Sequence, residues 1–352
     1  MVVTVSAQLK RQMGWDIGVV TLIDDFTRAH PLRDAGVPIL SLSLGSVWNW
    51  PLGTVRLARI VAQWQPDIVH AHLFQASVVV ALSQLLGSPH GKPVLLVSEH
   101  STTNRRRGLP GGRVFDEYLY GKYKAVICVS KAVESSLLQW LPSLRGRTRV
   151  IYNPVHIPPF TWDPRGPKDW DVLYVGRLVE QKGVDVLLHA VHAAATRMGP
   201  LRVAIAGDGP LRLRLEKAAE ALGISGMIDF MGWQKDPTSL MLRTKVIVIP
   251  SRCEGLGNVV LEAMSVGVPI VASRVGGITE LLEDGVSGRL VPGGNAETLG
   301  EALAEVLAGG DRGAAERWGA NARARAQAYF RMDIHVATIA QLYESVTGRL
   351  HG

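Results

Sequence analysis

Residues 251–292 read SRCEGLGNVVLEAMSVGVPIVASRVGGITELLEDGVSGRLVP. Glu254 and Glu262 lie eight residues apart, the first at the end of a loop and the second two turns into the helix expected to follow. Gly255 and Gly257 leave backbone amides uncovered at the start of that helix, and a helix N-terminus favours negative charge. The two carboxylates can accept hydrogen bonds from vicinal hydroxyls, and the amides can bind phosphate or sugar oxygens. This combination suits a nucleotide sugar.

Two cations lie upstream in VGRLVEQKG, residues 175–183. Arg177 follows an expected strand and Lys182 begins the next helix, so both are expected at the carboxyl edge of a parallel sheet, where ligands bind. Two such cations can stabilise the negative charge that grows on a departing diphosphate. The alternative is surface pairing with Glu180 or Asp185, and the surrounding motifs favour the diphosphate.

Short apolar, β-branched runs alternate with amphipathic helical patterns along the chain. Runs that are apolar on both faces predict strands of parallel sheets covered by helices. The prolines and glycines of residues 154–170 interrupt the rhythm and predict a linker between two doubly wound domains. The expected strands are residues 17–22, 37–42, 68–72, 94–98, 125–129 and 149–152 before the linker, and residues 172–175, 202–206, 227–231, 246–249 and 270–272 after it.

The motifs together resemble family 4 of the retaining glycosyltransferases, also called glycosyl transferases group 1. The two glutamates are followed by GVPIVAS and VGGITEL, and VGRLVEQKG and GDGP (residues 207–210) precede them in the order that this family uses. The resemblance covers about residues 2–343. It implies the GT-B fold, an α/β architecture in which two Rossmann-like domains face each other across a cleft. The implied division is residues 1–153 for the acceptor-side domain, 154–170 for the linker, 171–330 for the nucleotide-sugar-binding domain, and 331–352 for a helix crossing back.

The resemblance also implies roles for individual residues. Arg177 and Lys182 bind the diphosphate, Glu254 the transferred sugar and Glu262 the ribose. His100, which ends the strand at residues 94–98, faces the donor sugar, although a histidine at a strand end is often only a hydrogen-bonded structural residue. The remaining donor-binding residues are Gly176, Gly207, Asp208, Gly209, Gly255, Leu256, Gly257 and Asn258. No cofactor and no metal are implied, and His70 and His72, which share a strand face, form a weak metal candidate without a nearby carboxylate or cysteine cluster.

Composition limits the class of protein. The chain has 352 residues, of which 47% are hydrophobic and 20% charged, which is typical of a soluble globular protein with room for two cores. No apolar run is long enough to span a membrane, and Lys10, Arg11 and Asp16 interrupt any signal peptide. Two cysteines fit a reduced compartment, so a cytoplasmic location is expected.

The positive charge is concentrated in the first half. Residues 1–160 hold 17 Lys/Arg against 9 Asp/Glu, whereas residues 161–352 hold 21 against 22. Arg105, Arg106 and Arg107 are part of this excess. Two interpretations stay open: an ordinary solvated face, or a surface for anionic lipid or a diphosphate-bearing acceptor, which would place the protein peripherally on the inner face of the cell membrane. Nucleic acid is not expected as a partner, because the basic residues lack interleaved aromatics.

The chain begins unusually for a doubly wound domain. Residues 2–13 have helical spacing, so the opening strand and its glycine-rich turn are missing and an N-terminal truncation is expected. The strands at residues 17–22 and 68–72 would then leave a gap in the sheet or close up on each other.

The expected function is transfer of a sugar, with retention, from a nucleotide sugar to a saccharide or lipid-linked acceptor in surface polysaccharide or glycolipid synthesis. The SEHSTTNRRR stretch at residues 98–107 resembles that of capsule and O-antigen transferases that use UDP, so the resemblance implies UDP as the nucleotide. Hexose and N-acetylhexosamine both stay open as the transferred sugar. Two alternatives remain: a catalytically silent nucleotide-sugar-binding subunit, and a UDP-sugar epimerase of the same fold.

Overall fold

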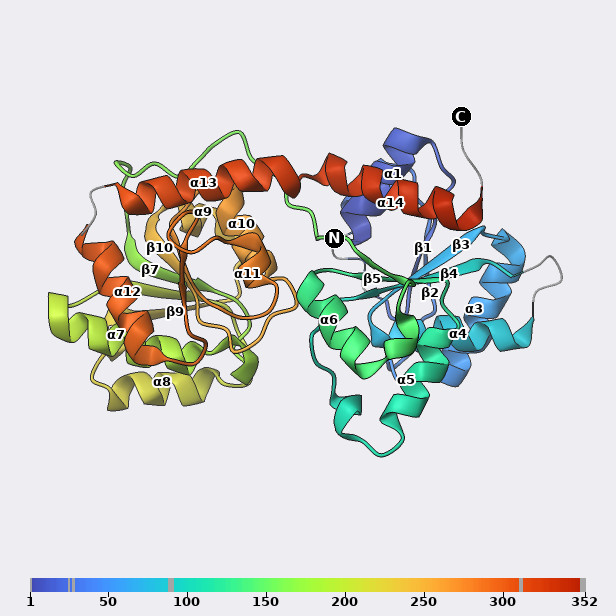
Figure 1. The fold of residues 1–352 in the computed structure, drawn as a ribbon, viewed down its shortest axis with the longest axis horizontal. Coiled ribbons are helices and arrows are strands. Elements are labelled where there is room, and N and C mark those ends of the chain that lie inside the picture. Colours follow the sequence, from blue (N-terminus) through green and yellow to red (C-terminus); the bar gives the residue numbers. More distant parts are fainter. Residues whose placement is uncertain (1, 25, 27–28, 88–91, 310–312, 349–352) are drawn as a thin grey trace. The chain divides into compact units, whose positions relative to one another are not determined.

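The computed structural model describes residues 2–24, 26, 29–87, 92–309 and 313–348 (Figure 1). The chain divides into two compact units. The first comprises Met1–Asn153 with Met332–Gly352, and the second comprises Pro154–Arg331.

The second unit is a six-stranded parallel sheet in the order β12-β11-β10-β7-β8-β9. The earliest strand, β7, lies inside the sheet and the chain winds outward from it in both directions, which is the doubly wound arrangement. The strands are β7 Trp170–Val175, β8 Val203–Ala206, β9 Ile228–Gly232, β10 Thr244–Ile249, β11 Ile270–Ser273 and β12 Arg289–Val291. The helices are α7 Val184–Met198, α8 Arg212–Ala221, α9 Pro237–Leu242, α10 Asn258–Val266, α11 Ile278–Leu281, α12 Ala296–Ala308 and α13 Ala314–Tyr329, with 3-10 turns η4 Glu180–Lys182 and η5 Ser225–Met227.

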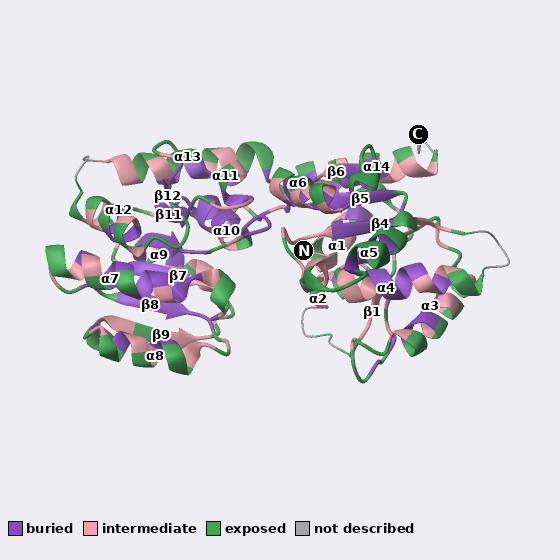
Figure 2. Cartoon of the chain, turned by 60° about the horizontal axis from the view of Figure 1, so that its bottom comes forward, coloured by how far each residue is buried: buried purple, intermediate pink, exposed green. Residues whose placement is uncertain are grey.

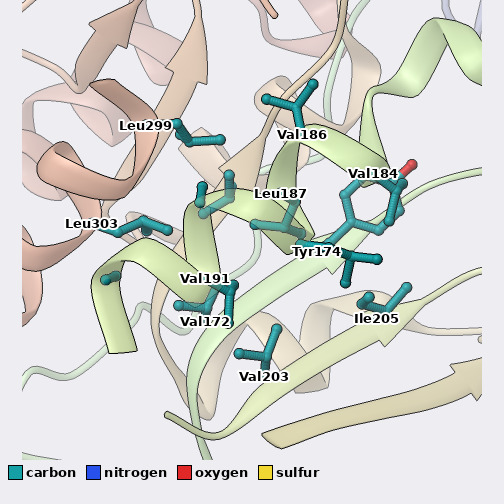
Figure 3. Close-up of a cluster of buried hydrophobic side chains, with 14 of the residues drawn as sticks. Val172, Tyr174, Val184, Val186, Leu187, Val191, Val203, Ile205, Leu299 and Leu303 are labelled. Carbon is teal, nitrogen blue, oxygen red and sulfur yellow. The ribbon is translucent and has the colours of Figure 1, made fainter. Parts of the chain in front are cut away.

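The core of this unit explains why its inner strands read as continuous apolar runs. Val172 and Tyr174 of β7 belong to one buried hydrophobic cluster with Leu187 of α7 and Leu303 of α12 (Figure 3). Leu173, between them on the other face of the sheet, is also fully buried. Figure 2 shows β7 and β8 buried, whereas the edge strand β9 is largely half-buried. A strand covered on both faces has no side on which polar residues are favoured.

The first unit contains two separate parallel sheets. One has four strands in the order β3-β4-β5-β6, and the other pairs β1 with β2. The strands are β1 Val19–Thr21, β2 Ile39–Ser41, β3 Ile68–His72, β4 Val94–Glu99, β5 Ala125–Cys128 and β6 Thr148–Val150. The helices are α1 Val2–Met13, α2 His30–Asp34, α3 Trp50–Trp64, α4 Phe74–Ser83, α5 Gly112–Gly121, α6 Lys131–Trp140 and α14 Met332–Thr347, with 3-10 turns η1 Gln84–Leu86, η2 Arg105–Gly108 and η3 Pro142–Leu144.

The division of this sheet lies between β1 and β3. Residues 2–13 form α1, as their spacing predicted. No strand in the described part of the chain joins β1 to β3, so the two do not pair directly. Only Ala71 of the five β3 residues is buried, whereas four of the six β4 residues are buried. β3 therefore has the burial of an edge strand, in keeping with its place at the end of the four-stranded sheet.

The predicted linker, residues 154–170, is not a free segment. Trp162 donates from its backbone N to the Val266 carbonyl at 2.7 Å and from its indole Nε1 to the Thr244 carbonyl at 2.7 Å. The Thr161 hydroxyl also donates to Val266 O, at 2.9 Å. The prolines prevent regular secondary structure, but the aromatic side chain still packs on the second unit.

Candidate functional site

Four loops of the second unit meet at the carboxyl edge of its sheet. They follow β7, β8, β10 and β11, which are neighbours in the order β8-β7-β10-β11. Backbone hydrogen bonds join them: Leu178 N donates to Asp208 O at 2.9 Å, and Gly277 N donates to Glu254 O at 3.3 Å. This is the edge at which ligands bind in doubly wound sheets.

Glycine permits these loops to approach so closely. A Cβ on Gly207 would lie 1.8 Å from the Gly176 carbonyl oxygen, and a Cβ on Gly276 would lie 1.9 Å from the Glu254 carbonyl oxygen. Any side chain at either position would force the backbone apart. The glycines of GDGP and VGGITEL therefore keep adjacent loops in van der Waals contact, which a sequence pattern alone does not reveal.

A partly buried ion pair lies at the centre of this edge. Lys182 Nζ lies 2.6 Å from Glu254 Oε1, and the Ser251 hydroxyl donates to the same oxygen at 2.8 Å. Ser251 and Glu254 are 1% and 7% exposed, so water screens this contact little. Both donors bind Oε1, so Oε2 is the carboxylate oxygen that the described contacts leave for a ligand. Sequence reasoning missed Ser251, whose only signal is its position three residues before Glu254.

Arg177 and Glu262 lie on either side of this pair in the sequence. The Arg177 side chain is exposed, while its carbonyl accepts a hydrogen bond of 3.0 Å from the Tyr174 hydroxyl. Burial raises the pKa of Tyr174, which keeps that hydroxyl protonated as a donor. Glu262 is half-buried on α10, and burial raises the pKa of its carboxyl group. A carboxylate that is poorly solvated gains more from a hydrogen-bonding ligand than an exposed one does.

The other predicted donor-binding residues occupy the same loops. Asp208 accepts a hydrogen bond from Gly209 N at 2.7 Å, so its carboxylate shapes the turn after β8. Leu256 is 3% exposed, so only its backbone can face a ligand. Asn258 begins α10 directly after Gly257, whose φ is +98°. The roles of these residues stay predictions.

His100 belongs to the first unit, where it directly follows β4. Glu99 accepts hydrogen bonds from His100 N at 3.1 Å and Ser101 N at 3.2 Å, and it also accepts one from the Tyr120 hydroxyl. The Glu99 carboxylate therefore holds the turn that carries His100. Burial lowers the pKa of His100, so its imidazole is neutral near neutral pH.

His70 and His72 share one face of β3, as their alternation predicted, with ring centroids 4.1 Å apart. Both nitrogens of His70 have partners: Nδ1 lies 2.6 Å from the Tyr343 hydroxyl and Nε2 lies 2.8 Å from the Ser98 hydroxyl. Those contacts leave His70 no lone pair for a metal. Within the described ranges, no group of three or more His, Cys, Asp or Glu is arranged to hold a metal ion.

Two family models match the chain, and between them they cover most of it. The model described as Glycosyltransferase Family 4 matches residues 1–157, and the model described as Glycosyl transferases group 1 matches residues 163–325. The chain belongs to this glycosyltransferase family. The glycine-lined edge and the Lys182–Glu254 pair lie within the second match.

Several proteins resemble this glycosyltransferase family member. An uncharacterized glycosyltransferase of Methanocaldococcus jannaschii is 30% identical over 246 residues, which cover 68% of this chain and 65% of the relative. The lipopolysaccharide core biosynthesis glycosyltransferase LpsE of Rhizobium meliloti is 37% identical over 137 residues, 39% of each chain. The chain thus spans less than two thirds of the length of these relatives.

Solved structures show the same fold as this family member. The crystal structure of Anabaena HepE in complex with UDP-glucose has a TM-score of 0.83 at 21% identity, covering 98% of this chain and 94% of that one. Sucrose-phosphate synthase from Thermosynechococcus elongatus has a TM-score of 0.81 at 22% identity, covering 98% of this chain and 92% of that one. The GT-B fold and the α/β prediction are therefore confirmed. None of the helices that the structure describes is both long and apolar enough to cross a membrane.

The buried histidines predict a pH dependence of stability. Burial lowers the pKa of His72 from 6.5 to about 3, and His70, His100 and His335 are shifted in the same direction. Because the unfolded chain then binds more protons, stability falls as the pH drops below about 6.5. Between pH 6.5 and 5, His72 alone accounts for about 2 kcal/mol.

Urea unfolding followed by tryptophan fluorescence at pH 5 and pH 7.5 measures this dependence. His72→Gln should reduce the difference between the two pH values, and His72 Nδ1 has no hydrogen-bond partner to lose among the described residues. His189 or His192, which are both exposed on α7, supply the control substitution. An unchanged pH dependence in His72→Gln would contradict the assignment.

Proposed function

We propose that this chain transfers a sugar from a nucleotide sugar to a saccharide or lipid-linked acceptor, and that the carboxyl edge of the second unit binds the donor. The observation that carries the proposal is the Lys182–Glu254–Ser251 contact, set among four loops that glycines keep in contact. The Lys182 side chain is 21% exposed, so its ammonium group is partly desolvated, and an anionic ligand beside it offsets part of that cost.

The ion pair and a diphosphate can be bound together. An ammonium group has three donors, so Lys182 can keep one hydrogen bond to Glu254 while the others reach phosphate oxygens. The exposed guanidinium of Arg177 adds a second, bidentate donor. Because these charges belong to the chain, the proposed reaction needs no divalent metal. His100, on the first unit, is assigned to the donor sugar by family resemblance alone.

We further propose UDP as the nucleotide, with the ribose hydroxyls donating to Glu262 and a sugar hydroxyl donating to Glu254 Oε2. The HepE structure, solved with UDP-glucose, supports the choice of nucleotide through its shared fold. Retention of anomeric configuration belongs to the same proposal. LpsE, a relative that acts in lipopolysaccharide core biosynthesis, supports an acceptor in envelope glycolipid synthesis.

Ligand-induced melting shifts test the donor. A UDP-sugar at 100 times its dissociation constant should stabilise the protein by about 2.7 kcal/mol, and the sugar giving the largest shift identifies the donor. Glu262→Gln should lower the shift, while Glu220→Gln, an exposed residue in the last turn of α8 in the same unit, serves as a matched control. No shift with any UDP-, GDP- or ADP-sugar would overturn the proposal.

A catalytically silent donor-binding subunit is the second candidate, because the sheet of the first unit is divided. Product analysis separates the two. Release of the free nucleotide with a glycosylated acceptor supports transfer, and the reaction should continue in the presence of EDTA. A melting shift with a nucleotide sugar, but no turnover with any extract tested as a source of acceptor, supports the silent subunit.

We also propose contact with an anionic membrane, but through α5 more than through the arginine cluster formed by Arg105, Arg106 and Arg107. Arg106 pairs with Asp116 at 2.6 Å, and Arg107 donates to the Ser136 hydroxyl at 2.7 Å, so both have internal partners. By contrast, Val114 and Tyr118 on α5 are 72% and 50% exposed, beside exposed basic residues. Sedimentation with anionic and neutral vesicles, using Val114→Ser and Tyr118→Ser, tests this contact, and equal sedimentation with both lipids would exclude it.

A further inference from the structure

A basic cavity lies at the amino-terminal edge of the four-stranded sheet in the first unit. Lys124 directly precedes β5 and Arg147 directly precedes β6. Lys92 lies just before the start of β4. β4, β5 and β6 are parallel neighbours, so their first residues lie along one edge, spaced about 4.8 Å per strand. The three cations are thereby gathered in one place by the topology, although they are far apart in the sequence.

This edge is opposite the one that carries His100. His100 follows the carboxyl end of β4 and Lys92 precedes its amino end, so the six-residue strand separates them by about 20 Å. A ligand at the amino-terminal edge therefore cannot be the reacting donor or acceptor group near His100. The site has to serve another purpose than the proposed transfer.

The cavity has a volume of about 580 Å³ and combines charge with apolar surface. Its charged lining residues are Lys92, Lys122, Lys124 and Arg147, and none of the described residues that line it is an aspartate or glutamate. Its apolar lining includes Ala81, Leu85, Pro93, Leu95, Tyr123 and Val346. Asp67 precedes β3 at the same edge but lies outside the cavity. The volume is within the usual range for small-molecule sites.

One of the four cations is held rigidly. Arg147 Nη2 donates to the carbonyl of Tyr120 at 3.2 Å and also to that of Tyr123. These bonds tie its guanidinium to the end of α5. Lys92 and Lys124 are exposed and can rearrange around a ligand, whereas Lys122 Nζ lies over the Tyr118 ring, 4.4 Å from its centroid. Four like charges around one cavity repel each other, and an anion between them relieves that repulsion.

The apolar lining indicates which class of anion the cavity binds. Leu85 is 61% exposed and the adjacent Leu86 is 56% exposed, so hydrocarbon surface is left open to water at the rim. A small inorganic anion would leave it uncovered. We propose that this cavity binds a phosphorylated amphiphile, with the phosphate between the cations and the hydrocarbon chain against Leu85 and Val346. The free energy of binding then has both an electrostatic and a hydrophobic part.

Titration calorimetry with short-chain phosphatidic acid, kept below its micelle concentration, tests this proposal on the full chain. We expect binding that Lys92→Gln and Lys124→Gln each weaken by about tenfold, the loss typical of one charge-assisted contact. Lys235→Gln, an exposed lysine of the second unit, is the control and should bind normally. Arg147 is left intact because its bonds to the end of α5 support the fold.

Two further ligands separate the sources of binding. Leu85→Ser should weaken phosphatidic acid but not inorganic phosphate, and zwitterionic phosphatidylcholine of equal chain length should bind at least tenfold more weakly than phosphatidic acid. Inorganic phosphate binding as tightly as the amphiphile would overturn the proposal, as would normal binding by both lysine variants. Because the assay measures binding without turnover, its result is independent of the proposed sugar transfer.

Discussion

Replacing Lys182 by alanine is expected to lower kcat by about 100-fold or more, the usual cost of removing one contact to the charge that develops in a transition state. Arg177→Ala should cost a similar factor, because its guanidinium is the other cation assigned to the diphosphate. Steady-state kinetics with the donor found by melting shifts measures both effects. Near-native turnover in either variant would remove the diphosphate assignment.

The two variants should differ in stability, and this difference separates catalysis from folding. Arg177 is exposed, so its loss should leave unfolding unchanged. Lys182→Ala strands the Glu254 carboxylate, whose side chain is 9% exposed, at a cost of about 3 kcal/mol. Lys182→Met combined with Glu254→Gln removes both charges, so it should recover stability without recovering turnover. Recovery of turnover in the double variant would show that Lys182 acts only through the fold.

Gly276→Ala should destabilise the second unit by at least about 3 kcal/mol. Its Cβ would lie 1.9 Å from the Glu254 carbonyl oxygen, so the loop after β10 must move and take Glu254 with it. Chemical unfolding and donor binding measure the two consequences. Stability and donor binding should be lost together.

Gly285→Ala is the matched control for that substitution. Gly276 has a φ of +48° and Gly285 a φ of +72°, so both variants carry the strain of an alanine in the left-handed backbone conformation. At Gly285, however, a Cβ would meet nothing within 4 Å, and the cost should be only about 1 kcal/mol. Equal losses in the two variants would show that backbone conformation, and not loop contact, makes Gly276 necessary.

Sequence patterns predicted the fold well where burial on both faces produced continuous apolar runs. β7, β8, β10 and β11 were all expected within a few residues of their observed bounds, because inner strands leave the strongest compositional signal. The loops between these strands place Arg177, Lys182 and Glu254 at one edge, as parallel pairing requires. The 154–170 segment was harder to predict, since prolines exclude regular structure without revealing what Trp162 packs against.

Side-chain contacts that form only in the folded chain, within the candidate site and outside it, were not predictable in the same way. Ser251 binds Glu254 through a side chain that no motif distinguishes from other serines. Arg106 belongs to a run of three arginines, a pattern typical of a solvated face, yet it pairs with Asp116, which is fully buried on α5. Both depend on distances between residues brought together only by the folded chain.

The division of the first unit's sheet gives α1 a mechanical role. Its Ala7 packs with Leu32 and Val37 beside the β1–β2 pair, while its Leu9 packs with Ile127 and Ile151 beside the four-stranded sheet. With no ladder between β1 and β3 in the described chain, this helix is one of the elements that join the two sheets, together with Ile17, which packs against both clusters. If the packing of α1 were lost, the β1–β2 pair would open as a sub-global unit while β3 to β6 remain folded. Amides of β1 and β2 should then exchange with solvent long before those of β4 and β5.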